Sequence, residues 1–568
     1  MSKNTINGGE AVYRVLRDQG VKTVFGLLGG SMLELYDAIH GGGDVAYVGA
    51  RDERAAGHMA DAYARVTGGP GVVLGAQAGP GVVNLVTAVA EAHLAYSPLV
   101  VIAGAISRSD LGKDTFQEIN QVSLFAPISK RSIMVTEPAR LAEMVRDAIR
   151  LAMSGRRGPV VLHVPRDIFA ADMEPPAPGP VSIASAGPPP HSDISAIATM
   201  LSEAKAPVIV AGGGFKWSDG ADALKQLAEA VDVPVVASTG HADVMPHGHR
   251  LFAGQGGPRG NAVASRLTRE ADLLLVLGAR LAFNSTFHSH DYISETADIV
   301  QIDVEGSSIG RYFPVVLGVQ ADVRETAKSL LQEVQERNMS SSGWADWLDR
   351  FHADWAALQD ERATEAENDT VPMHPQRALA EIRGTLPDNA IVTLDTGNTC
   401  LQAADRLAHH QTPALITPLD FGLVGFGYAA ALGAKAAAPD RPVVSIMGDG
   451  GFGYTMAEIS SAVQHDLRVV AVVLDNGAWG AEKAYQSEFF GGRLLGAEIG
   501  SPPYDEVAKL CGALGFAVEM PGDLASALRE ALTADQPTVI HVKIDPNALS
   551  TLRKDLFKPT SNNGTPKP

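Results

Sequence analysis

The sequence predicts an α/β protein of three domains, each built on a doubly wound parallel sheet. Short apolar runs rich in β-branched residues alternate with longer helical patterns, which is typical of βαβ units with buried parallel strands. The chain has 568 residues, enough for three or four domains of ordinary size. Two stretches, 172–193 and 357–376, have the composition of linkers: the first is rich in proline, glycine and serine, and the second is polar and ends in two prolines. They divide the chain into three blocks.

Each block contains its own set of candidate strands. These are 21–27, 71–77 and 99–105 in the first block, 206–213, 233–238, 271–278 and 297–303 in the second, and 389–395, 441–449, 467–475 and 537–545 in the third. We expect domains over 1–175, 190–335 and 365–548, followed by a C-terminal tail at 549–568. In open parallel sheets, ligands bind beyond the carboxyl ends of the strands, so the loops after these runs are where we expect the chemistry.

The composition excludes several classes of partner. The formal net charge is −19 and the acidic residues are spread along the chain, so we expect no general attraction to nucleic acid or to anionic membranes. No apolar run approaches the length of a membrane span, and the first residues are not those of a signal peptide. Cys400 and Cys511 lie far apart and form no metal-ligand pattern, which fits a reducing cytoplasm. We expect a cytoplasmic enzyme whose anionic substrate meets a local basic site.

The stretch 448–483 brings two polar residues to the ends of two strands. Asp449 follows the buried run RPVVSIM in a GDGG loop, and Asn476 follows the run LRVVAVVLD. Between them the pattern predicts one helix over 452–466. Because neighbouring parallel strands end at the same edge of a sheet, we expect the Asp449 and Asn476 side chains to lie side by side.

These residue types suit a magnesium-bound phosphate. One carboxylate, one amide oxygen and a nearby backbone carbonyl make an incomplete oxygen shell of the kind that Mg²⁺ prefers when a phosphate completes it. Gly448, Gly450 and Gly451 would let the backbone approach that phosphate. The alternative is a tight turn with Asp449 as a helix cap, but a turn gives no reason for Asn476.

A GDG followed some 25 to 30 residues later by an asparagine resembles the diphosphate-binding motif of thiamine-diphosphate enzymes. The resemblance extends over nearly the whole chain, in the order seen in the acetolactate synthase and pyruvate oxidase group. It implies a pyrimidine-binding domain, a middle Rossmann-like domain and a diphosphate-binding domain, with thiamine diphosphate and Mg²⁺ as cofactors. It also implies that the backbone of Ala478 belongs to the metal and cofactor site with Asp449 and Asn476.

The resemblance assigns the catalytic acid to Glu53, in the stretch VGARDERAAGHMADAYARVTG. This residue would contact the aminopyrimidine nitrogen N1′ and drive the proton relay that activates the cofactor, and burial would favour its neutral form. A surface salt bridge with Arg51 or Arg54 is the alternative. Asp52 stands where related sequences usually have a histidine.

Further segments match the group in order. The stretch 75–92 resembles a Gly-Pro-Gly loop leading into a helix at the dimer interface, and 115–130 resembles the segment whose Phe116 and Gln117 approach the substrate from the partner subunit.

The resemblance also implies contacts from Gly397, Asn398 and Thr399 to the diphosphate, and from Val424 to the bent cofactor, although Val424 by itself would be an ordinary core residue. It implies a homodimer or homotetramer in which Glu53 of one chain meets Asp449 and Asn476 of another.

The stretch WGAEK at 479–483 resembles sulfoacetaldehyde acetyltransferases, which convert sulfoacetaldehyde and phosphate to acetyl phosphate and sulfite. The stretches 116–121, 241–257 and 552–559 also resemble that group. A sulfonate and a phosphate both require cations. The cations in these and adjoining segments are Lys483, Arg493, Arg553, Lys554 and Lys558, and each alone is equally well explained as a solvated surface residue.

Other reactions stay open because 487–500 and 421–428 depart from the acetyltransferase pattern. The alternatives are an acetolactate-synthase-like carboligase or 2-oxoacid decarboxylase, a lyase of 2-hydroxyacyl-CoA or oxalyl-CoA, and a non-catalytic scaffold. Intact Glu53, Asp449 and Asn476 argue against the scaffold. Arg280 and Asp303 resemble contacts to a nucleotide (FAD, ADP or CoA) in some relatives, but both stretches are also plain strand ends, so we do not favour that site.

Overall fold

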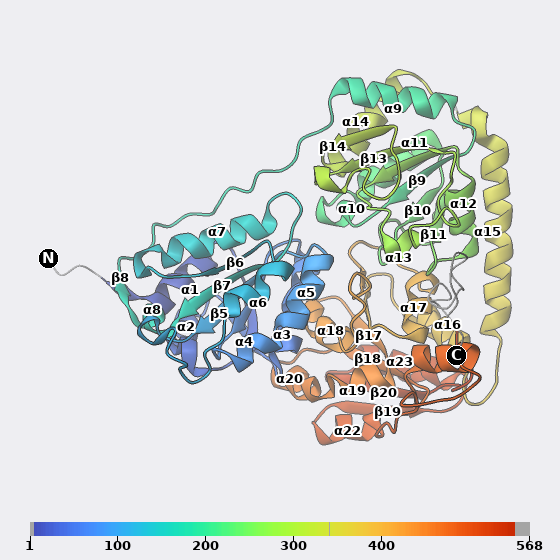
Figure 1. Cartoon of the computed structure of the whole chain (residues 1–568). Coiled ribbons are helices and arrows are strands. Elements are labelled where there is room, and N and C mark those ends of the chain that lie inside the picture. Colours follow the sequence, from blue (N-terminus) through green and yellow to red (C-terminus); the bar gives the residue numbers. More distant parts are fainter. Residues whose placement is uncertain (1–4, 340, 551–568) are drawn as a thin grey trace, which may run out of the picture.

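Every run predicted as a strand is part of a parallel sheet in the computed structural model of the chain, which describes residues 5–339 and 341–550 (Figure 1). There are three such sheets, each with six parallel strands, and each belongs to one α/β domain. The predicted fold class is therefore confirmed. Within the described residues, no helix combines the length and the apolarity needed to cross a membrane.

The first domain has the strand order β3-β2-β4-β5-β7-β6. These strands are β2 (Thr23–Leu27), β3 (Ala46–Gly49), β4 (Gly71–Gly75), β5 (Leu99–Ala105), β6 (Arg131–Met134) and β7 (Val160–Pro165). One face of the sheet packs on α1 (Gly8–Asp18), α2 (Leu33–Gly42) and α7 (Leu141–Met153). The other packs on α3 (Glu53–Thr67) and α5 (Val86–Leu94). Alternate residues of each strand face the two helix layers, as expected for a sheet buried on both sides.

The middle domain has the order β11-β10-β9-β12-β13-β14. Its strands are β9 (Pro207–Ala211), β10 (Val235–Ala237), β11 (Phe252–Gln255), β12 (Leu273–Leu277), β13 (Asp298–Asp303) and β14 (Leu317–Gln320). Helices α9 (His191–Glu203), α11 (Ala221–Val231) and α14 (Val323–Glu336) pack together, and α12 (Ala262–Glu270) packs against β9, β10 and β11.

The third domain has the order β16-β15-β17-β18-β20-β19. Its strands are β15 (Ile391–Leu394), β16 (Leu415–Ile416), β17 (Val443–Gly448), β18 (Val470–Asp475), β19 (Leu514–Val518) and β20 (Thr538–Lys543). Helices α16 (Pro375–Thr385), α17 (Asn398–Arg406) and α23 (Asp523–Thr533) contribute to one core cluster. Helix α18 (Gly427–Ala437) lies on the other side and packs along α3, so one hydrophobic cluster runs through the first and third domains.

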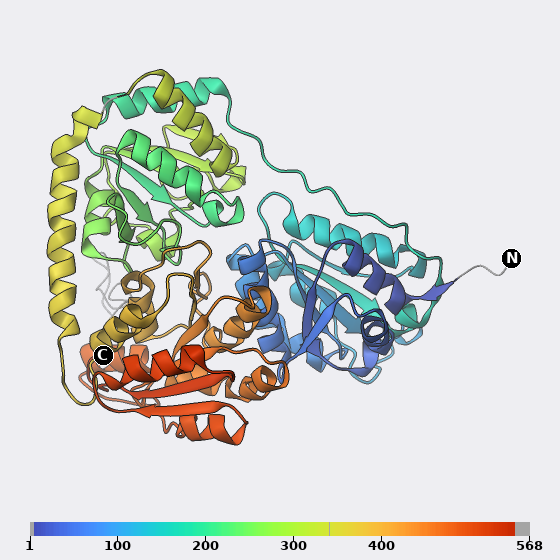
Figure 2. The same ribbon diagram turned by 180° about the vertical axis from the view of Figure 1, so that it is seen from behind.

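The two predicted linkers differ in structure. The first begins with a two-residue strand, β8 (Asp172–Met173), which pairs with β1 (Ile6–Asn7), and then runs without helix or strand to α9. The prediction for 357–376 is wrong over its first half, because α15 (Ala345–Ala366) continues through residue 366. Figure 2 shows this long helix beside the middle and third domains.

The polar residues of α15 are helical because they have partners. Arg362 is buried and forms an ion pair with Asp405 of α17, and Glu365 pairs with Arg406. Trp355 and Leu358 pack against the middle-domain core. The helix therefore joins two domains through contacts that composition alone does not reveal.

The predicted continuous helix over 452–466 is also wrong. The chain forms a short helix, α19 (Asp449–Gly453), then a 3₁₀ turn at Met456–Glu458, then α20 (Ile459–Gln464). The GDGG segment is consequently the end of β17 and the first turn of α19 rather than an open loop. The hydroxyl of Tyr504 donates to the backbone carbonyl of Asp449 at 2.8 Å and holds this turn.

Candidate active site

The residues after β17 and β18 form the centre of the site. The two strands are parallel neighbours with Gly448 opposite Leu474. Asp449 is the first residue of α19, and Asn476 is the first residue after β18. Asp449 is 1% exposed, and Asn476 is half-buried. The structure thus brings these two predicted residues to one edge of the sheet.

Asp449 has a perturbed carboxyl group. Burial raises its pKa to about 6, the Ser501 hydroxyl opposes this shift by donating to Oδ2 at 2.6 Å, and the negative charge of Asp475 adds to it. The amide oxygen of Asn476 accepts only a 3.2 Å bond from the backbone N–H of Ala478 among the described residues. A cation beside these two oxygens would relieve the cost of the buried carboxylate.

Asp475, the last residue of β18, is a charged support for this edge. Burial acts to raise its pKa, but hydrogen bonds from His541 and Lys543 outweigh it and hold the pKa well below its ordinary value. His541 Nε2 lies 2.7 Å from Asp475 Oδ2, and the backbone N–H of Gly477 donates to Oδ1 at 2.8 Å. Asp475 therefore fixes the turn that carries Asn476.

The glycines leave room for a ligand on one side of the two strand ends. A Cβ on Gly451 would lie 2.4 Å from Asp395 Oδ2 and 3.6 Å from Val424 Cγ1, so the backbone there packs directly on these residues. In contrast, no described atom lies within 4 Å of the Cβ position of Gly397 or Gly448. The open space faces two of the predicted diphosphate loops.

A carboxylate that sequence reasoning did not single out joins three of these segments. Asp395, directly after β15, accepts hydrogen bonds from the backbone N–H groups of Thr396, Gly425 and Phe426 at 2.8 to 3.3 Å. Burial raises its pKa to about 7, although these hydrogen bonds oppose the shift. Asp395 holds the loop containing Val424 against the loop containing Gly397.

Asn398 and Thr399 begin α17 and are both buried. The Asn398 amide donates to the carbonyl of Ser550 at 2.5 Å, and its oxygen accepts from the Ser550 N–H at 3.1 Å. In this structure the side chain of Asn398 therefore anchors the end of the described chain. Backbone groups of the loop stay available for a diphosphate.

The donor set fits a magnesium diphosphate better than a metal held by protein alone. Among the described residues, no three His, Cys, Asp or Glu side chains are grouped so as to bind a metal. The structure brings one carboxylate, Asp449, and one amide oxygen, Asn476, to this edge, and the family resemblance adds the carbonyl of Ala478, so oxygens from a bound diphosphate would have to complete the shell. The residues present are compatible with thiamine diphosphate and Mg²⁺.

Glu53 is the first residue of α3 and is 6% exposed. It is not in the surface salt bridge considered from the sequence: Arg54 pairs with Asp52, and Arg51 donates to Gln464. The carboxylate instead accepts a hydrogen bond from the Asn84 amide at 3.0 Å and lies against Gly81. Asp52, in the position where a histidine was expected, caps α3 by accepting from the Arg54 N–H at 2.7 Å.

Phe116 and Gln117 lie on an exposed segment near the glycine loop. Phe116 is 83% exposed, and Gln117 has a φ of +68°. The Gln117 side chain accepts from Gln77 at 2.5 Å, and Gln77 accepts from the Gly30 N–H at 2.9 Å. These contacts place Gln117 beside the loop that precedes Pro80.

A buried hydrogen-bond chain supports the same loop. The Ser132 hydroxyl donates to the carbonyl of Val122, so the neighbouring Nε2 of His163 must donate to Ser132. His163 Nδ1 then accepts from Gln121, whose amide oxygen accepts the Gly79 N–H at 2.9 Å. Burial lowers the pKa of His163 to about 4, which keeps the ring neutral.

Of the five cations predicted to meet the substrate, the structure describes Lys483 and Arg493. Lys483 lies in α21 (Gly480–Phe489), is 11% exposed at its side chain and pairs with Glu498 at 3.3 Å. The backbone N–H of Arg493 donates to the Phe490 carbonyl. The three basic residues of the tail, Arg553, Lys554 and Lys558, lie outside the described residues.

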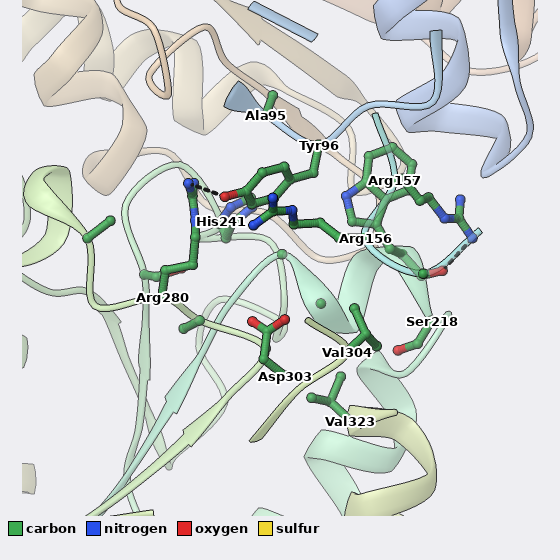
Figure 3. Close-up of a pocket in the computed structure, with 18 of the residues that line it drawn as sticks. Ala95, Tyr96, Arg156, Arg157, Ser218, His241, Arg280, Asp303, Val304 and Val323 are labelled. Atoms are coloured by element: carbon green, nitrogen blue, oxygen red, sulfur yellow. Dashed lines mark hydrogen bonds between the residues drawn. The ribbon is translucent and has the colours of Figure 1, made fainter. Parts of the chain in front are cut away.

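A separate cavity of about 600 Å³ lies where the three domains meet. Figure 3 shows Asp303 on its middle-domain side and Tyr96 with Arg156 on the opposite side. Arg280, predicted as a nucleotide contact, donates to the Tyr96 hydroxyl at 2.8 Å and to Asp420 at 2.7 Å. Burial raises the pKa of Asp303. Arg280 therefore links three domains at the cavity wall.

Comparison with known proteins agrees with this arrangement. Family models described as the N-terminal TPP binding domain, the central domain and the C-terminal TPP binding domain of thiamine pyrophosphate enzymes match residues 6–124, 194–330 and 395–542. The chain belongs to the thiamine pyrophosphate enzyme family. It is accordingly an enzyme that uses thiamine diphosphate.

Relatives with two kinds of name match nearly the whole chain. A sulfoacetaldehyde acetyltransferase of Alcaligenes xylosoxydans xylosoxydans is 33% identical, with 92% of this chain and 90% of that protein covered. The acetolactate synthase isozyme 3 large subunit of Escherichia coli is 32% identical, with 93% and 92% covered. A probable acetolactate synthase large subunit of Methanococcus aeolicus is 29% identical, with 96% and 93% covered. Overall identity therefore does not separate the two reactions.

Several residues of the site were not predicted from the sequence. Each of them holds a predicted site residue, or the loop that carries it, by hydrogen bonds. Asp395 and Asp475 each end a strand run, and this position alone could have marked them. Ser501 and Tyr504 come from a segment more than 50 residues after Asp449, without a strand end or glycine motif to indicate them. Only the folded chain brings them to the site.

Proposed function

We propose that the enzyme transfers a two-carbon unit from sulfoacetaldehyde to phosphate, giving acetyl phosphate and sulfite. The observation that carries the cofactor site is the adjacent placement of Asp449 and Asn476 beside open space at Gly397 and Gly448. The choice of substrate is supported by the stretch at 479–483, in which Lys483 is largely covered and held by Glu498.

The residues divide into three tasks. Asp449, Asn476 and the Ala478 carbonyl would hold Mg²⁺ and, through it, the diphosphate, with Gly448 allowing close approach. Gly450 and Gly451 instead make room for Trp479 and Asp395, which pack against this turn. Thiamine diphosphate, when bound, supplies a carbon nucleophile for a substrate carbonyl. Glu53 would exchange a proton with N1′ of the aminopyrimidine, and its buried position excludes bulk water from that exchange. Val424, held against Gly451, would support the bent cofactor.

The anionic substrates would meet Lys483 and residues of a second chain. Phe116 and Gln117 are proposed to reach the substrate of the neighbouring subunit. Exposed apolar side chains beside the loop at residues 77–79 support burial against another copy: Leu28, next to Gly29, is 61% exposed, and Phe116, next to Gln117, is 83% exposed. A homodimer is the smallest proposed assembly, and a homotetramer is compatible with it.

The decisive experiment is anaerobic incubation of the protein, loaded with Mg²⁺ and thiamine diphosphate, with sulfoacetaldehyde and phosphate. We expect equimolar sulfite and acetyl phosphate, and neither product from an Asp449→Ala variant. Consumption of pyruvate with formation of acetolactate, in the absence of both products, would instead identify an acetolactate-synthase-like carboligase. Consumption of a 2-hydroxyacyl-CoA or oxalyl-CoA would identify a lyase.

The cavity between the domains supports a second binding function. Gly213 and Gly214 follow β9 and Asp303 ends β13, so the carboxyl ends of two strands of one sheet line it, together with Arg156. We propose that it accepts the phosphate and ribose of FAD, ADP or CoA, with Asp303 receiving the ribose hydroxyls. Calorimetric titration with each nucleotide tests this. Asp303→Ala should weaken binding. If FAD, ADP and CoA all give no heat of binding, the proposed nucleotide site is excluded.

A further inference from the structure

The Glu53 carboxylate is seated between two residues of a single short helix. Asn84 Nδ2 lies 3.0 Å from Oε2, and a Cβ added to Gly81 would lie 2.8 Å from Oε1. Both belong to α4 (Pro80–Asn84), which follows the glycine loop. No described residue donates a hydrogen bond to Oε1. The two oxygens are therefore distinguished by the protein: Oε2 is held, and Oε1 is left without a donor.

Within the part of the chain that the structure describes, Glu53 is the hydrogen-bond partner of the Asn84 amide, and no second role of this amide is evident. Helix α5 starts two residues later without a side-chain cap, so Asn84 does not cap it. Asn84 is itself exposed, while its amide nitrogen reaches a carboxylate that is buried. The amide nitrogen of Asn84, rather than its oxygen, faces Glu53, so Asn84 is the donor and Oε2 the acceptor.

We propose that Asn84 is a positioning residue for the proton transfer of Glu53: it holds Oε2 and leaves Oε1 as the oxygen that exchanges a proton with a ligand. The inference rests on the proposed function, in which Glu53 is the catalytic acid. Gly81 contributes by having no side chain to occupy the space beside Oε1.

The physical consequence of losing this amide would be a change in the orientation of the carboxylate. Without the hydrogen bond to Oε2 the Glu53 carboxyl group could rotate, and either oxygen could then face the ligand. Other groups face the same carboxylate or its helix start: Tyr36, Asp52, Arg54 and Glu458. They are unchanged in an Asn84 variant, so a difference between variants reports the amide alone.

The first test needs no cofactor. Protein labelled with ¹³C at glutamate carboxyls is compared with its variants at one fixed pH, and the Glu53 resonance is assigned by its loss in Glu53→Gln. Asn84→Ala should move this resonance, because the carboxylate loses the amide hydrogen bond to Oε2. Asn84→Gln, which keeps an amide, should restore part of the change. An unmoved Glu53 resonance in Asn84→Ala would overturn the inference.

The second test measures exchange of the C2 proton of thiamine diphosphate in the Mg²⁺-loaded protein. Asn84→Ala should slow exchange by about tenfold and change its pH profile, and Gly81→Ala should slow it by pressing on Oε1. Gln332→Ala, which removes an exposed amide hydrogen bond to Glu336 in the middle domain, is the matched control and should exchange at the wild-type rate.

The roles of Glu53 and Asn84 are distinguished by different outcomes. If Glu53→Gln exchanges normally, the acid itself is misplaced and the proposed function loses its catalytic residue. If Glu53→Gln abolishes exchange but Asn84→Ala keeps both the rate and the pH profile, only the positioning role is wrong.

Discussion

At the residue scale, the site depends on carboxyl groups with different neighbours. Asp475 is paired with a histidine and a lysine and stays ionised, whereas Asp449 and Asp395 are buried without a cation and have raised pKa values. The first supports a turn, the second lies where we propose a metal, and the third joins backbone loops. Surroundings rather than residue type separate these three roles.

Glu53→Gln should separate binding from catalysis. Glutamine keeps the size of the side chain and can still contact Asn84, so we expect normal folding and cofactor affinity. It has no proton to exchange with the pyrimidine, so C2 proton exchange should fall by about 100-fold or more. Calorimetry with thiamine diphosphate and Mg²⁺ measures the affinity, and NMR of quenched samples measures the exchange. An unchanged exchange rate would contradict the assignment of the acid.

Asp395→Asn should loosen the cofactor loops. The carboxylate accepts from three backbone N–H groups, but an asparagine offers one oxygen and turns a donor toward the others. Each buried N–H left without an acceptor costs about 1–3 kcal/mol. We expect thiamine diphosphate affinity to drop by at least about tenfold. Asp466→Asn, on the exposed surface, is the control, and equal affinity in both variants would refute the supporting role.

At the scale of elements, α15 acts as a brace between the middle and third domains. Its buried Arg362 pairs with Asp405, which also accepts from Asn261 of the middle domain at 3.0 Å. The ion pair thus lies at a junction of α15, α17 and the loop before α12. A polar sequence is helical here because the partner charges come from two other domains.

Arg362→Met should test this brace. It leaves Asp405 buried without its cation, which costs about 3–5 kcal/mol of the free energy of unfolding. Arg350→Met on the same helix breaks an exposed pair with Glu270 and should cost less than about 1 kcal/mol. Urea denaturation followed by far-UV circular dichroism compares the two. Equal losses would show that burial of the Arg362 pair contributes nothing.

At the scale of the whole molecule, the first and third domains are joined through a charged cluster between α3 and α5. Arg65 donates to Asp61, Glu91 and the carbonyl of Thr417 in the third domain. Two carboxylates share one guanidinium in a buried site. Burial, with the charge of Asp61, raises the pKa of Glu91 to about 8 despite Arg65.

Stability should therefore decrease with rising pH between about 4.5 and 8 through Glu91. The folded protein keeps the Glu91 proton in this window, whereas the unfolded chain releases it, so folding binds a proton and is weakened as protons become scarce. The slope attributable to Glu91 is at most about 1.4 kcal/mol per pH unit. Glu91→Gln should lack this component when urea midpoints are compared across the window. If the urea midpoints of the wild type and of Glu91→Gln change in parallel with pH, the raised pKa of Glu91 is contradicted.

The sequence alone determined the class of this protein because its information is local. Runs of β-branched residues become buried strands wherever two helix layers cover them, and Asp449 and Asn476 fall at neighbouring strand ends by chain connectivity. The same local information, through a resemblance to a family, predicts Glu53 as the catalytic acid. Edge strands such as β6 and β14 were not predicted because they are short and partly exposed, which leaves a weak apolar pattern.

Only the tertiary structure decided which groups touch. Asn84 meets Glu53, Ser501 meets Asp449, and Arg362 meets Asp405 across 31, 52 and 43 residues of chain. No periodicity or spacing encodes such pairs, because they depend on how helices and strands far apart in the chain pack together. The strand ends thus place the chemistry at one edge of the sheet, while the packing of distant segments sets the orientation and charge of each group there.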